Sequence, residues 1–579
     1  MIRRIPCDLH DNTARGVLQD EVRAGGIGCG LCNRLTYPPF RYQYASFVRM
    51  MAKMTLADHK EPATDAAPSA DDIADAIAVL EQLAADRSLL ALLSQEEMHR
   101  LMRAAEGVAV PDRVSRMKLR RAIQKREKAE LARQKAEDEA LLAQTGIRKQ
   151  QAPKRIKQAC APAPFEPEPP PSCEPSDDQF GPRLQVPRSC YICKRDYDRV
   201  HCFYDSMCPD CAALNWTKRN QTADLSGRYA LVTGGRVKIG YQAALKLLRA
   251  GAHVVVTTRF PRDASARFLE EADSGAWKDR LQLYGIDLRH TPSVELLADH
   301  LVATLPRLDF LLNNACQTVR RPPGFYAHLM EGETRSLASL PTAAKPLLAG
   351  YEKLRREGLS GPTNGKPLPA QVRDSLAGIQ RAAELSQIPL APGDKTNGSD
   401  IFPAGQYDQD QQQVDLRTIN SWRLPLADVP TVELLEVHLV NAVAPFILNA
   451  RLKPLMLRVP TRDKHIVNVS AMEGVFYRAY KTDKHPHTNM AKAALNMLTR
   501  TSAQDYVADG IHMNSVDTGW ITDEDPADIA ARKREELGFH PPLDTIDAAA
   551  RICDPIFAGL LTGEHLWGNF LKDYQVANW

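Results

Sequence analysis

The 579-residue sequence has almost no net charge, no apolar run of membrane-spanning length and no export signal at its start. Its 74 basic and 71 acidic residues leave a formal charge of +3, which gives no general attraction to nucleic acid or to an anionic membrane. The basic start at residues 1–6 is not followed by the apolar segment of a signal peptide. No window offers the roughly 20 apolar residues that span a bilayer. We therefore expect a cytoplasmic protein whose partner is neither membrane nor nucleic acid.

Cysteine is scarce except in one short segment, where five of the twelve cysteines lie between Cys190 and Cys211. In a chain without an export signal, such clustering favours metal ligands over disulfides. Two CxxC pairs separated by fourteen residues suit one structural zinc ion, because each pair forms a tight knuckle and four thiolates close the coordination shell. The predicted ligands are Cys190, Cys193, Cys208 and Cys211. His201 or Cys202 is the substitute if one knuckle is misassigned, and buried free cysteines are the other interpretation.

Composition divides the chain into five segments. Residues 70–147 have apolar residues at helical spacing, and Ser94 with Glu97 forms a capping box before one helix. The basic run at 118–135 has interspersed glutamates and is interpreted as a solvated helix face. The predicted segments are an irregular N-terminus (1–69), a helical region (70–147), a proline-rich linker (148–188), a zinc-binding module (189–224) and a large domain (225–579).

The large domain begins with a strand, a glycine-containing turn, a helix and a second strand. The apolar segments 228–233 and 253–258 are the predicted strands, and the turn Thr233–Gly240 leads directly into an amphipathic helix. Backbone N–H groups in such a turn, together with the helix N-terminus, can bind a pyrophosphate. The pattern therefore predicts an α/β domain that binds a dinucleotide.

In this context the chain resembles the short-chain dehydrogenase/reductase family over some 350 residues. The TGxxxGxG loop of the family matches Thr233, Gly234 and Gly240, with Lys238 at the position of the middle glycine. Further matches are the adenine-pocket aspartate (Asp287), the NNAG motif (313–316), the relay asparagine (Asn441) and the final strand (568–573). The resemblance implies a doubly wound parallel sheet of the Rossmann type, a carbonyl or alcohol substrate and a homo-oligomer.

The residues near the second strand indicate which dinucleotide binds. No acidic residue follows this strand to hold the ribose 2′-hydroxyl of NAD, and Arg259 stands there instead. Arg236 and Lys238 add positive charge in the loop, so we expect NADP(H), although Lys238 could either pair with the pyrophosphate or crowd it. The predicted cofactor-binding residues are Thr233, Gly234, Arg236, Lys238, Ile239, Gly240, Arg259, Asp287, Leu288, Asn314, Ala315, Lys492, Gly519 and Thr522.

The catalytic positions of the family are only partly retained. The general acid of the family is a tyrosine four residues before a lysine, which places both on one helix face; here Thr488 precedes Lys492. The serine that holds the substrate carbonyl falls on Ala471, with Ser470 one place early. The candidate catalytic residues are Lys492, Asn441, Ser470, and His487 or Tyr480 as a replacement acid.

Three interpretations of this departure remain open. The protein is an NADP(H)-dependent oxidoreductase with a rebuilt acid, a nucleotide-binding sensor or scaffold without turnover, or an enzyme whose reaction needs no acid on that face. A long insert at 317–430 should leave the carboxyl edge of the sheet, where it would form a lid or a partner surface. Its Arg320, Arg321, Tyr326 and His328 could recognise an anionic substrate or simply pack the insert. For the sensor or scaffold, the zinc module and the insert are the candidate surfaces for a protein or nucleic-acid partner.

Overall fold

A computed structural model describes residues 68–151, 180–360, 374–391, 394, 401–408, 410–478, 481–522 and 524–579. The chain forms two compact units, Met1–Ala129 and Glu130–Trp579, and the division falls inside helix α4 (Arg113–Leu142). Tyr480, most of the predicted proline-rich linker and the N-terminal segment up to residue 67 lie outside the described residues.

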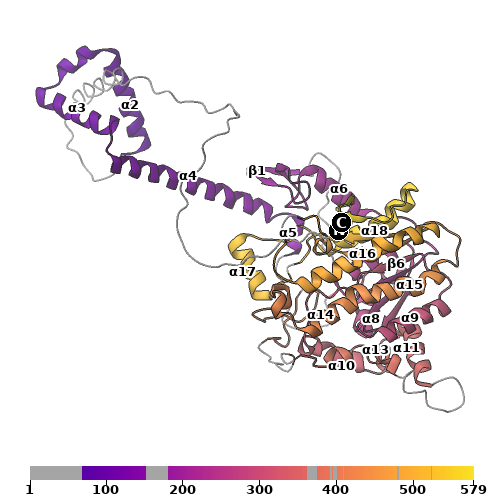
Figure 1. Cartoon of the computed structure of the whole chain (residues 1–579). Helices are drawn as coiled ribbons and strands as arrows, with labels where there is room; N and C mark the ends of the chain where they lie inside the picture. Colours follow the sequence, from indigo (N-terminus) through magenta and orange to yellow (C-terminus); the bar gives the residue numbers. More distant parts are fainter. Residues whose placement is uncertain are drawn as a thin grey trace, which may run out of the picture. The chain divides into compact units, whose positions relative to one another are not determined.

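The first unit is helical in its described part (Figure 1). It contains α2 (Ala70–Ala85), α3 (Gln95–Ala109) and the first half of α4. The predicted capping box is present at the start of α3: Ser94 Oγ accepts from Glu97 N–H at 3.3 Å, and Glu97 Oε2 accepts from Ser94 N–H at 2.8 Å. The basic run lies on α4, and its side chains are exposed apart from half-buried Gln134.

The second unit is built on an eight-stranded sheet in the order β10-β9-β8-β7-β6-β3-β4-β5. Its strands are β3 (Tyr229–Thr233), β4 (His253–Thr258), β5 (Leu281–Gly285), β6 (Phe310–Asn313), β7 (Lys464–Ser470), β8 (Ile511–Asp517), β9 (Phe570–Lys572) and β10 (Gln575–Ala577). All neighbours pair in parallel except β10, which is antiparallel to β9. The order reverses between β3 and β6, and ligands bind at such a switch point in doubly wound sheets. The predicted fold class is confirmed.

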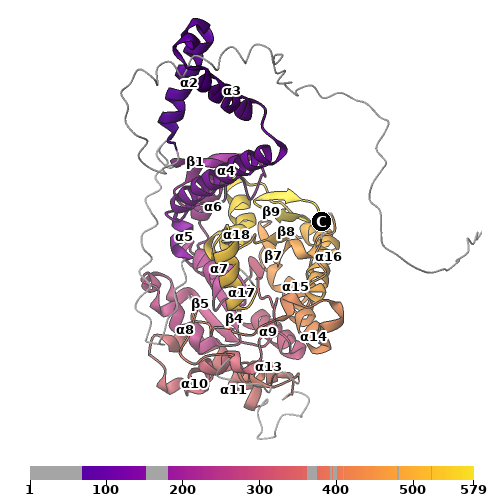
Figure 2. The ribbon, with the colours of Figure 1, turned by 90° about the vertical axis from the view of Figure 1, so that its left-hand side faces the viewer.

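Helices cover both faces of the sheet (Figure 2). They include α7 (Lys238–Arg249), α8 (Pro261–Glu270), α9 (Thr291–Thr304), α15 (Ala444–Met456), α16 (Pro486–Ala508) and α18 (Thr545–Thr562). Helix α7 packs against α18, α15 packs against α9, and α16 packs on β8. The strands are near-continuous apolar runs such as Val254–Val256 because parallel strands are buried on both sides.

Within the part of the chain that the structure describes, one segment, Thr431–Met456, is long and apolar enough to cross a membrane by length and composition. The expectation that no such segment exists was therefore wrong. The segment comprises α14 (Thr431–His438), a π-helical turn (Leu439–Val443) and α15. Leu448, Leu452 and Met456 on α15 are buried in the core. A core helix passes the same test as a membrane span, and we interpret this segment as a core helix.

The insert has two roles in the fold. Its helix α11 (Ala344–Ser360) packs on the outer strand β5 and on α8. Leu347, Leu348 and Tyr351 on α11 belong to the same hydrophobic core as the sheet, and Tyr351 Oη donates to Ile379 O at 2.9 Å. Later residues of the insert, among them Tyr407, Gln412 and Asp415, lie instead at the carboxyl ends of the strands. The first half of the insert is therefore part of the domain core, which a simple lid would not be.

Three histidines meet at the opposite, amino-terminal edge of the sheet and make folding sensitive to acid. His465 is fully buried, its Nε2 lies 3.0 Å from His565 Nδ1, and the rings of His512 and His565 stack at 4.6 Å. Burial, then the two neighbouring histidines, lower the pKa of His465 well below its usual value. In the unfolded chain, the imidazole of His465 takes up a proton near pH 6.5. The stability that His465 contributes in its neutral form is therefore fully present above that pH and is lost as the pH falls below it.

We expect the free energy of unfolding to fall by about 1.4 kcal/mol between pH 7.5 and pH 5.5 from His465 alone, since each pH step below the unfolded pKa contributes about that amount. Denaturant titration at the two pH values measures this loss. His465→Gln should flatten the pH dependence, whereas His99→Gln on exposed α3 should leave it unchanged. Equal pH dependence in the wild type and His465→Gln would contradict the assignment.

Candidate active site and metal centre

The glycine turn between β3 and α7 leaves no room for side chains at its key positions. A Cβ at Gly240 would lie 2.5 Å from Gly234 O and closer still to Asn314 Nδ2, and a Cβ at Gly234 would lie 2.8 Å from Ala315 Cα. Asn314 Nδ2 donates to Thr233 O at 2.9 Å. The turn therefore packs tightly on the loop after β6, and its backbone N–H groups can approach a ligand closely.

Lys238 occupies the turn in a conformation that favours glycine. Its φ of 56° is in the left-handed region, which costs a residue with a Cβ about 1 kcal/mol. Burial lowers the pKa of Lys238, but the negative charges of Asp410, Glu524 and Asp408 raise it by more. The pKa therefore lies above its usual value, and the ammonium group is held in its charged form. Two of these carboxylates come from the insert, and the third follows β8.

A cavity of about 810 Å³ opens at the carboxyl ends of β3, β4, β6, β7 and β8. It is large enough for a dinucleotide-sized ligand. The predicted cofactor residues that line it are Gly234, Arg236, Lys238, Ile239, Gly240, Arg259, Asp287, Leu288, Asn314, Ala315, Lys492, Gly519 and Thr522. Thr233 lies behind this wall, where its Oγ1 accepts from Ala315 N–H at 3.0 Å.

The insert completes the wall of the cavity near Arg236 and Arg259. Arg259 Nη2 donates to Tyr326 Oη at 2.8 Å, and Arg236 Nη2 donates to Gln412 Oε1 at 2.7 Å. Arg236 Nη1 also donates to Asp263 at 2.7 Å. Burial raises the pKa of Tyr326, but the neighbouring arginines lower it by more, with a net decrease. Tyr326 was already a candidate for ligand recognition, whereas Gln412 was missed because no motif marks its position in the insert.

Asp287 has a partner within the protein. Arg289 donates to both of its carboxylate oxygens, from Nε at 3.0 Å and from Nη2 at 2.6 Å. Burial raises the pKa of Asp287, yet the hydrogen bond and charge of Arg289 outweigh this and hold it below its usual value. An adenine amino group would meet a carboxylate that is already charge-paired.

Lys492 and Thr488 lie on the same buried face of α16, as their spacing predicts. Lys492 is 3% exposed, lines the cavity and donates from Nζ to Val469 O at 2.9 Å. Thr488 is 1% exposed, and its Oγ1 donates to Thr318 O at 3.4 Å. The position of the family acid is thus occupied by a buried hydroxyl bonded to the backbone of the insert.

Among the other described candidate catalytic residues, Ser470 lines the cavity, whereas Asn441 and His487 do not. Ser470 Oγ donates to Asn496 Oδ1 at 2.6 Å, and so bonds to α16. Asn441 lies in the π-helical turn, and its Nδ2 donates to Gln317 O and Val437 O. His487 is 1% exposed, its Nε2 is 3.9 Å from Glu433, and burial lowers its pKa to about 4. The geometry therefore does not favour His487 as the acid, and Ser470 would need another rotamer.

A carboxylate near the missing acid was not predicted from the sequence. Glu524 lines the cavity and accepts hydrogen bonds from Thr318 Oγ1 at 3.1 Å and Thr522 Oγ1 at 3.0 Å. Thr318 is also the residue whose carbonyl accepts from Thr488. Glu524 therefore connects the predicted nicotinamide threonine to the predicted acid position. Only its place shortly after β8 could have drawn attention to it.

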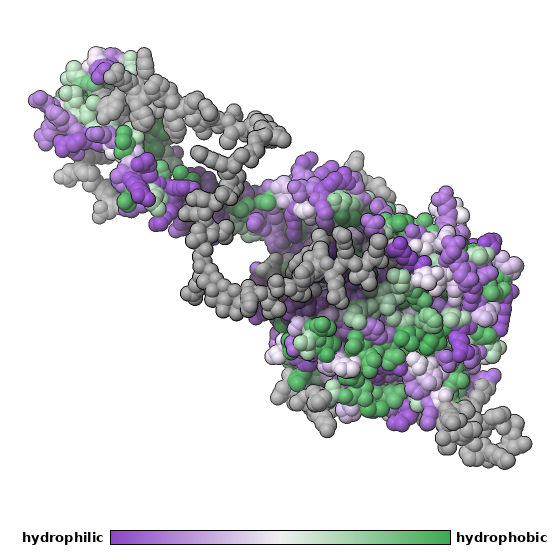
Figure 3. All heavy atoms as spheres, in the orientation of Figure 1, coloured by the Kyte–Doolittle hydropathy of each residue, from purple (hydrophilic) through white to green (hydrophobic). Residues whose placement is uncertain are grey.

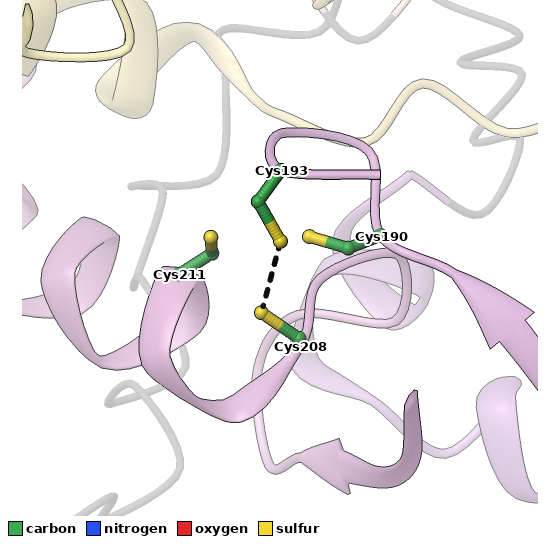
Figure 4. A group of neighbouring side chains, drawn as sticks. All are labelled: Cys190, Cys193, Cys208 and Cys211. Atoms are coloured by element: carbon green, nitrogen blue, oxygen red, sulfur yellow. Dashed lines mark hydrogen bonds between the residues drawn. The ribbon is translucent and has the colours of Figure 1, made fainter. Parts of the chain in front are cut away.

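The four predicted cysteines converge on one point (Figure 4). Their Sγ atoms all lie within 4.8 Å of one another, and Cys193 and Cys208 are 3.6 Å apart. One pair follows strand β1 (Phe180–Ser189), which forms a hairpin with β2 (Asp196–His201), and the other lies at the start of α6 (Pro209–Asn220). A hydrogen bond from Arg195 is the main cause that lowers the pKa of Cys193 to about 6, which favours the thiolate that a metal requires. The cluster includes neither His201 nor Cys202.

The cysteine module is packed onto the sheet domain through buried ion pairs. Arg219 on α6 donates to Asp544 at 2.7 Å and to Asp547 at 2.8 Å at the start of α18. Tyr204 Oη donates to Asp547 Oδ1 at 2.6 Å. Leu543 belongs to the hydrophobic core of the module. The cysteine module and the sheet domain are therefore one packed body and not independent parts joined by a tether.

A doubly wound sheet with a glycine turn and a buried lysine at its carboxyl edge defines a nucleotide-binding α/β protein. Two family models match it in chain order: short chain dehydrogenase at residues 228–334 and Enoyl-(Acyl carrier protein) reductase at residues 419–543. The interval between them lies within the insert. The chain belongs to the short-chain dehydrogenase/reductase family, a family of oxidoreductases.

Individual relatives match different amounts of the chain. An uncharacterized protein of Acanthamoeba polyphaga mimivirus is 32% identical over 381 residues, which cover 64% of this chain and 71% of that protein. Dehydrogenase/reductase SDR family member 13 of Bos taurus is 37% identical over 105 residues, 17% of this chain and 27% of that protein. The (+)-neomenthol dehydrogenase of Capsicum annuum is 30% identical over 118 residues, which cover 20% of this chain and 34% of that protein. The chain thus spans about a third or less of the two named enzymes.

Solved structures with related folds include two with NADP. The RhlG–NADP complex of Pseudomonas aeruginosa is 19% identical, with 60% of this chain and 95% of that chain covered and a TM-score of 0.34. A short-chain dehydrogenase of Burkholderia cenocepacia in complex with NADP is 18% identical. The match covers 60% of this chain and 97% of that chain, with a TM-score of 0.36. At these TM-scores the structures support no conclusion about the ligand of this chain.

Proposed function

We propose that this protein is an NADP(H)-dependent oxidoreductase acting on a carbonyl or alcohol substrate. The observation that carries the proposal is the 810 Å³ cavity, which brings the tight glycine turn, Arg259 and buried Lys492 to one edge of the sheet. When bound, NADP(H) would supply or accept the hydride. The turn would bind the pyrophosphate through backbone N–H groups, and Lys492 is placed to hold the nicotinamide ribose.

The residues of the glycine turn fit NADP(H), because a Cβ at Gly240 or Gly234 would fill the space that the pyrophosphate needs to approach the backbone closely. They also fit at the far end, where Arg259 can neutralise a 2′-phosphate, although Arg236 is already paired with Asp263. The carboxylates around Lys238 are the exception, because they face the position expected for the pyrophosphate. We infer that the side chains of Asp408 and Asp410 must turn away from the glycine turn when the dinucleotide binds.

Replacing Arg259 tests the cofactor assignment. Arg259→Ala should weaken NADPH binding by roughly 10- to 100-fold, since a hydrogen bond to a charged group contributes about 1.5–3 kcal/mol, and should change NADH binding little. Fluorescence titration with both nucleotides gives the ratio. Arg249→Ala, on the distal end of α7 and paired with Asp273, is the matched control. An equal loss for both nucleotides would contradict a 2′-phosphate role.

A second candidate, a nucleotide-binding sensor or scaffold without turnover, is favoured by one observation. The acid position holds Thr488, whose Oγ1 already donates to Thr318 O, and Ser470 is bonded to Asn496. A screen for NADPH oxidation against aldehydes and ketones separates the candidates. Tight NADPH binding without reduction of any carbonyl substrate would favour the sensor, whose protein or nucleic-acid partner would bind the cysteine module or the insert. Reduction of one aldehyde or ketone with matching oxidation of NADPH would support the oxidoreductase.

We further propose that the four cysteines hold a structural zinc ion. The four Sγ atoms are close enough to one another to form a closed tetrahedral shell around the ion, which leaves no position open for a substrate. Because the module packs on α18, the ion would stabilise the sheet domain as well.

A homo-oligomer in the cytoplasm is also proposed. Exposed apolar side chains gather on the outer face of α14, α15 and α16, over which Figure 3 shows a hydrophobic area. They include Leu435, Val443, Phe446, Met490 and Met497. A patch of this kind on a folded domain is typical of a protein–protein interface, and a second copy would cover it. Mass measurement in solution tests this.

A further inference from the structure

The first cysteine knuckle carries a tyrosine that contacts the wall of the cavity. Tyr191 lies between Cys190 and Cys193, and its phenolic oxygen accepts a hydrogen bond from Trp520 N–H at 3.0 Å. Trp520 belongs to the cavity loop (residues 518–522), every residue of which lines the cavity. One hydrogen bond therefore joins the metal centre to the cofactor cavity.

Other contacts on the same side hold the cavity loop against the module. Gly519 has a φ of 76°, and a Cβ there would collide with Leu543 and lie 3.5 Å from Tyr191 Oη. Ile521 packs against the hydrophobic core of the module, to which Leu543 also belongs. At the end of the loop, Thr522 Oγ1 donates to Glu524 Oε1 at 3.0 Å. The backbone conformation of the loop thus depends on a surface that the module provides.

The position of Tyr191 depends in turn on the fold of the knuckle. Tyr191 N–H donates to Ser206 O at 2.8 Å, and Lys194 Nζ donates to Tyr191 O at 2.6 Å. The same turn is closed by Cys190 N–H donating to Arg195 O at 2.9 Å. The ring is half-buried, with Lys572 Nζ 5.8 Å from its centroid. The turn that presents the thiolates therefore also aims the phenol at Trp520.

We propose that Tyr191 is a positioning residue, which holds the cavity loop in the conformation that binds the cofactor and couples metal binding at the cysteines to NADP(H) binding. The proposal rests on the proposed function, namely that the cavity binds NADP(H). Because coupling between two binding sites is reciprocal, the metal strengthens NADPH binding by the same factor by which NADPH strengthens metal binding.

The test compares two variants that each remove one phenolic hydroxyl from the module. Tyr191→Phe keeps the ring and loses the acceptor for Trp520 N–H. Tyr197→Phe is the matched control, because Tyr197 Oη donates to Asp205 O at 2.6 Å inside the module. We expect both variants to keep the zinc content and melting temperature of the wild type. Tyr191→Phe should bind NADPH about 3- to 10-fold more weakly, whereas Tyr197→Phe should bind it as the wild type does.

A second measurement needs no cofactor. Amide hydrogen exchange of a peptide that contains Trp520 should be faster in Tyr191→Phe than in the wild type and unchanged in Tyr197→Phe. If the wild type binds NADPH, an unchanged affinity or an unchanged exchange rate in Tyr191→Phe overturns the proposal. If the wild type binds no NADPH, the proposed function fails and exchange alone decides: faster exchange supports Tyr191 as the residue that positions the loop, and unchanged exchange overturns that role too.

Discussion

The Gly240→Ala variant is expected to bind NADPH roughly 100-fold or more weakly than the wild type, a loss of about 3 kcal/mol of binding free energy. A Cβ at this position would lie 2.5 Å from Gly234 O and closer to Asn314 Nδ2, so the turn and the loop after β6 must separate. The displacement breaks the hydrogen bonds from Asn314 to Thr233 O and Gly234 O, and it moves the N–H groups that would bind the pyrophosphate. Fluorescence titration of NADPH measures the loss.

The same substitution should also lower the melting temperature, because overpacking a tight contact costs about 1–3 kcal/mol. Gly275→Ala is the control, since a Cβ there has no heavy atom within 4 Å. It should leave both binding and melting unchanged. Undiminished NADPH affinity in Gly240→Ala would show that the turn does not hold the cofactor.

Cys208→Ser should remove the metal and destabilise the second unit by several kcal/mol. Structural zinc in small modules contributes about 10–16 kcal/mol of apparent binding free energy, and a hydroxyl cannot replace the thiolate. The loss reaches the sheet domain because Arg219 of the module pairs with Asp544 and Asp547 of α18. Elemental analysis gives the zinc content, and thermal unfolding gives the change in stability.

Cys316→Ser is the matched control, because Cys316 is exposed and lies outside the cysteine cluster. It should retain one zinc ion per chain and the melting temperature of the wild type. A wild-type protein without zinc, or a Cys208→Ser variant that keeps it, would refute the metal site.

Local patterns predicted the parts of the fold that depend on periodicity. The second strand was expected at 253–258, where β4 lies, and the helix with Lys492 has the expected register. The cysteine spacing likewise predicted a cluster that the structure brings together. These features are encoded by neighbouring residues, so one sequence is enough to find them.

The rest depends on contacts between distant segments, which spacing does not reveal. Nothing in the sequence distinguished α11, which completes the core beside β5, from the later residues of the insert that line the cavity. The direction of Ser470 was equally hidden, because it is set by Asn496 on a helix that follows later. Glu524 and Gln412 become pocket residues only through tertiary folding.

The ion pairs between the cysteine module and α18 also constrain the order in which the protein can mature. Arg219 reaches Asp544 and Asp547 across more than 300 residues of chain. During synthesis the module emerges first, while its docking partners have not yet been made. Contacts of such long range form slowly, since the intervening chain must first be ordered. The nascent protein therefore carries an uncovered Arg219 and Tyr204 until α18 leaves the ribosome, and this interval is when a chaperone would have most to protect.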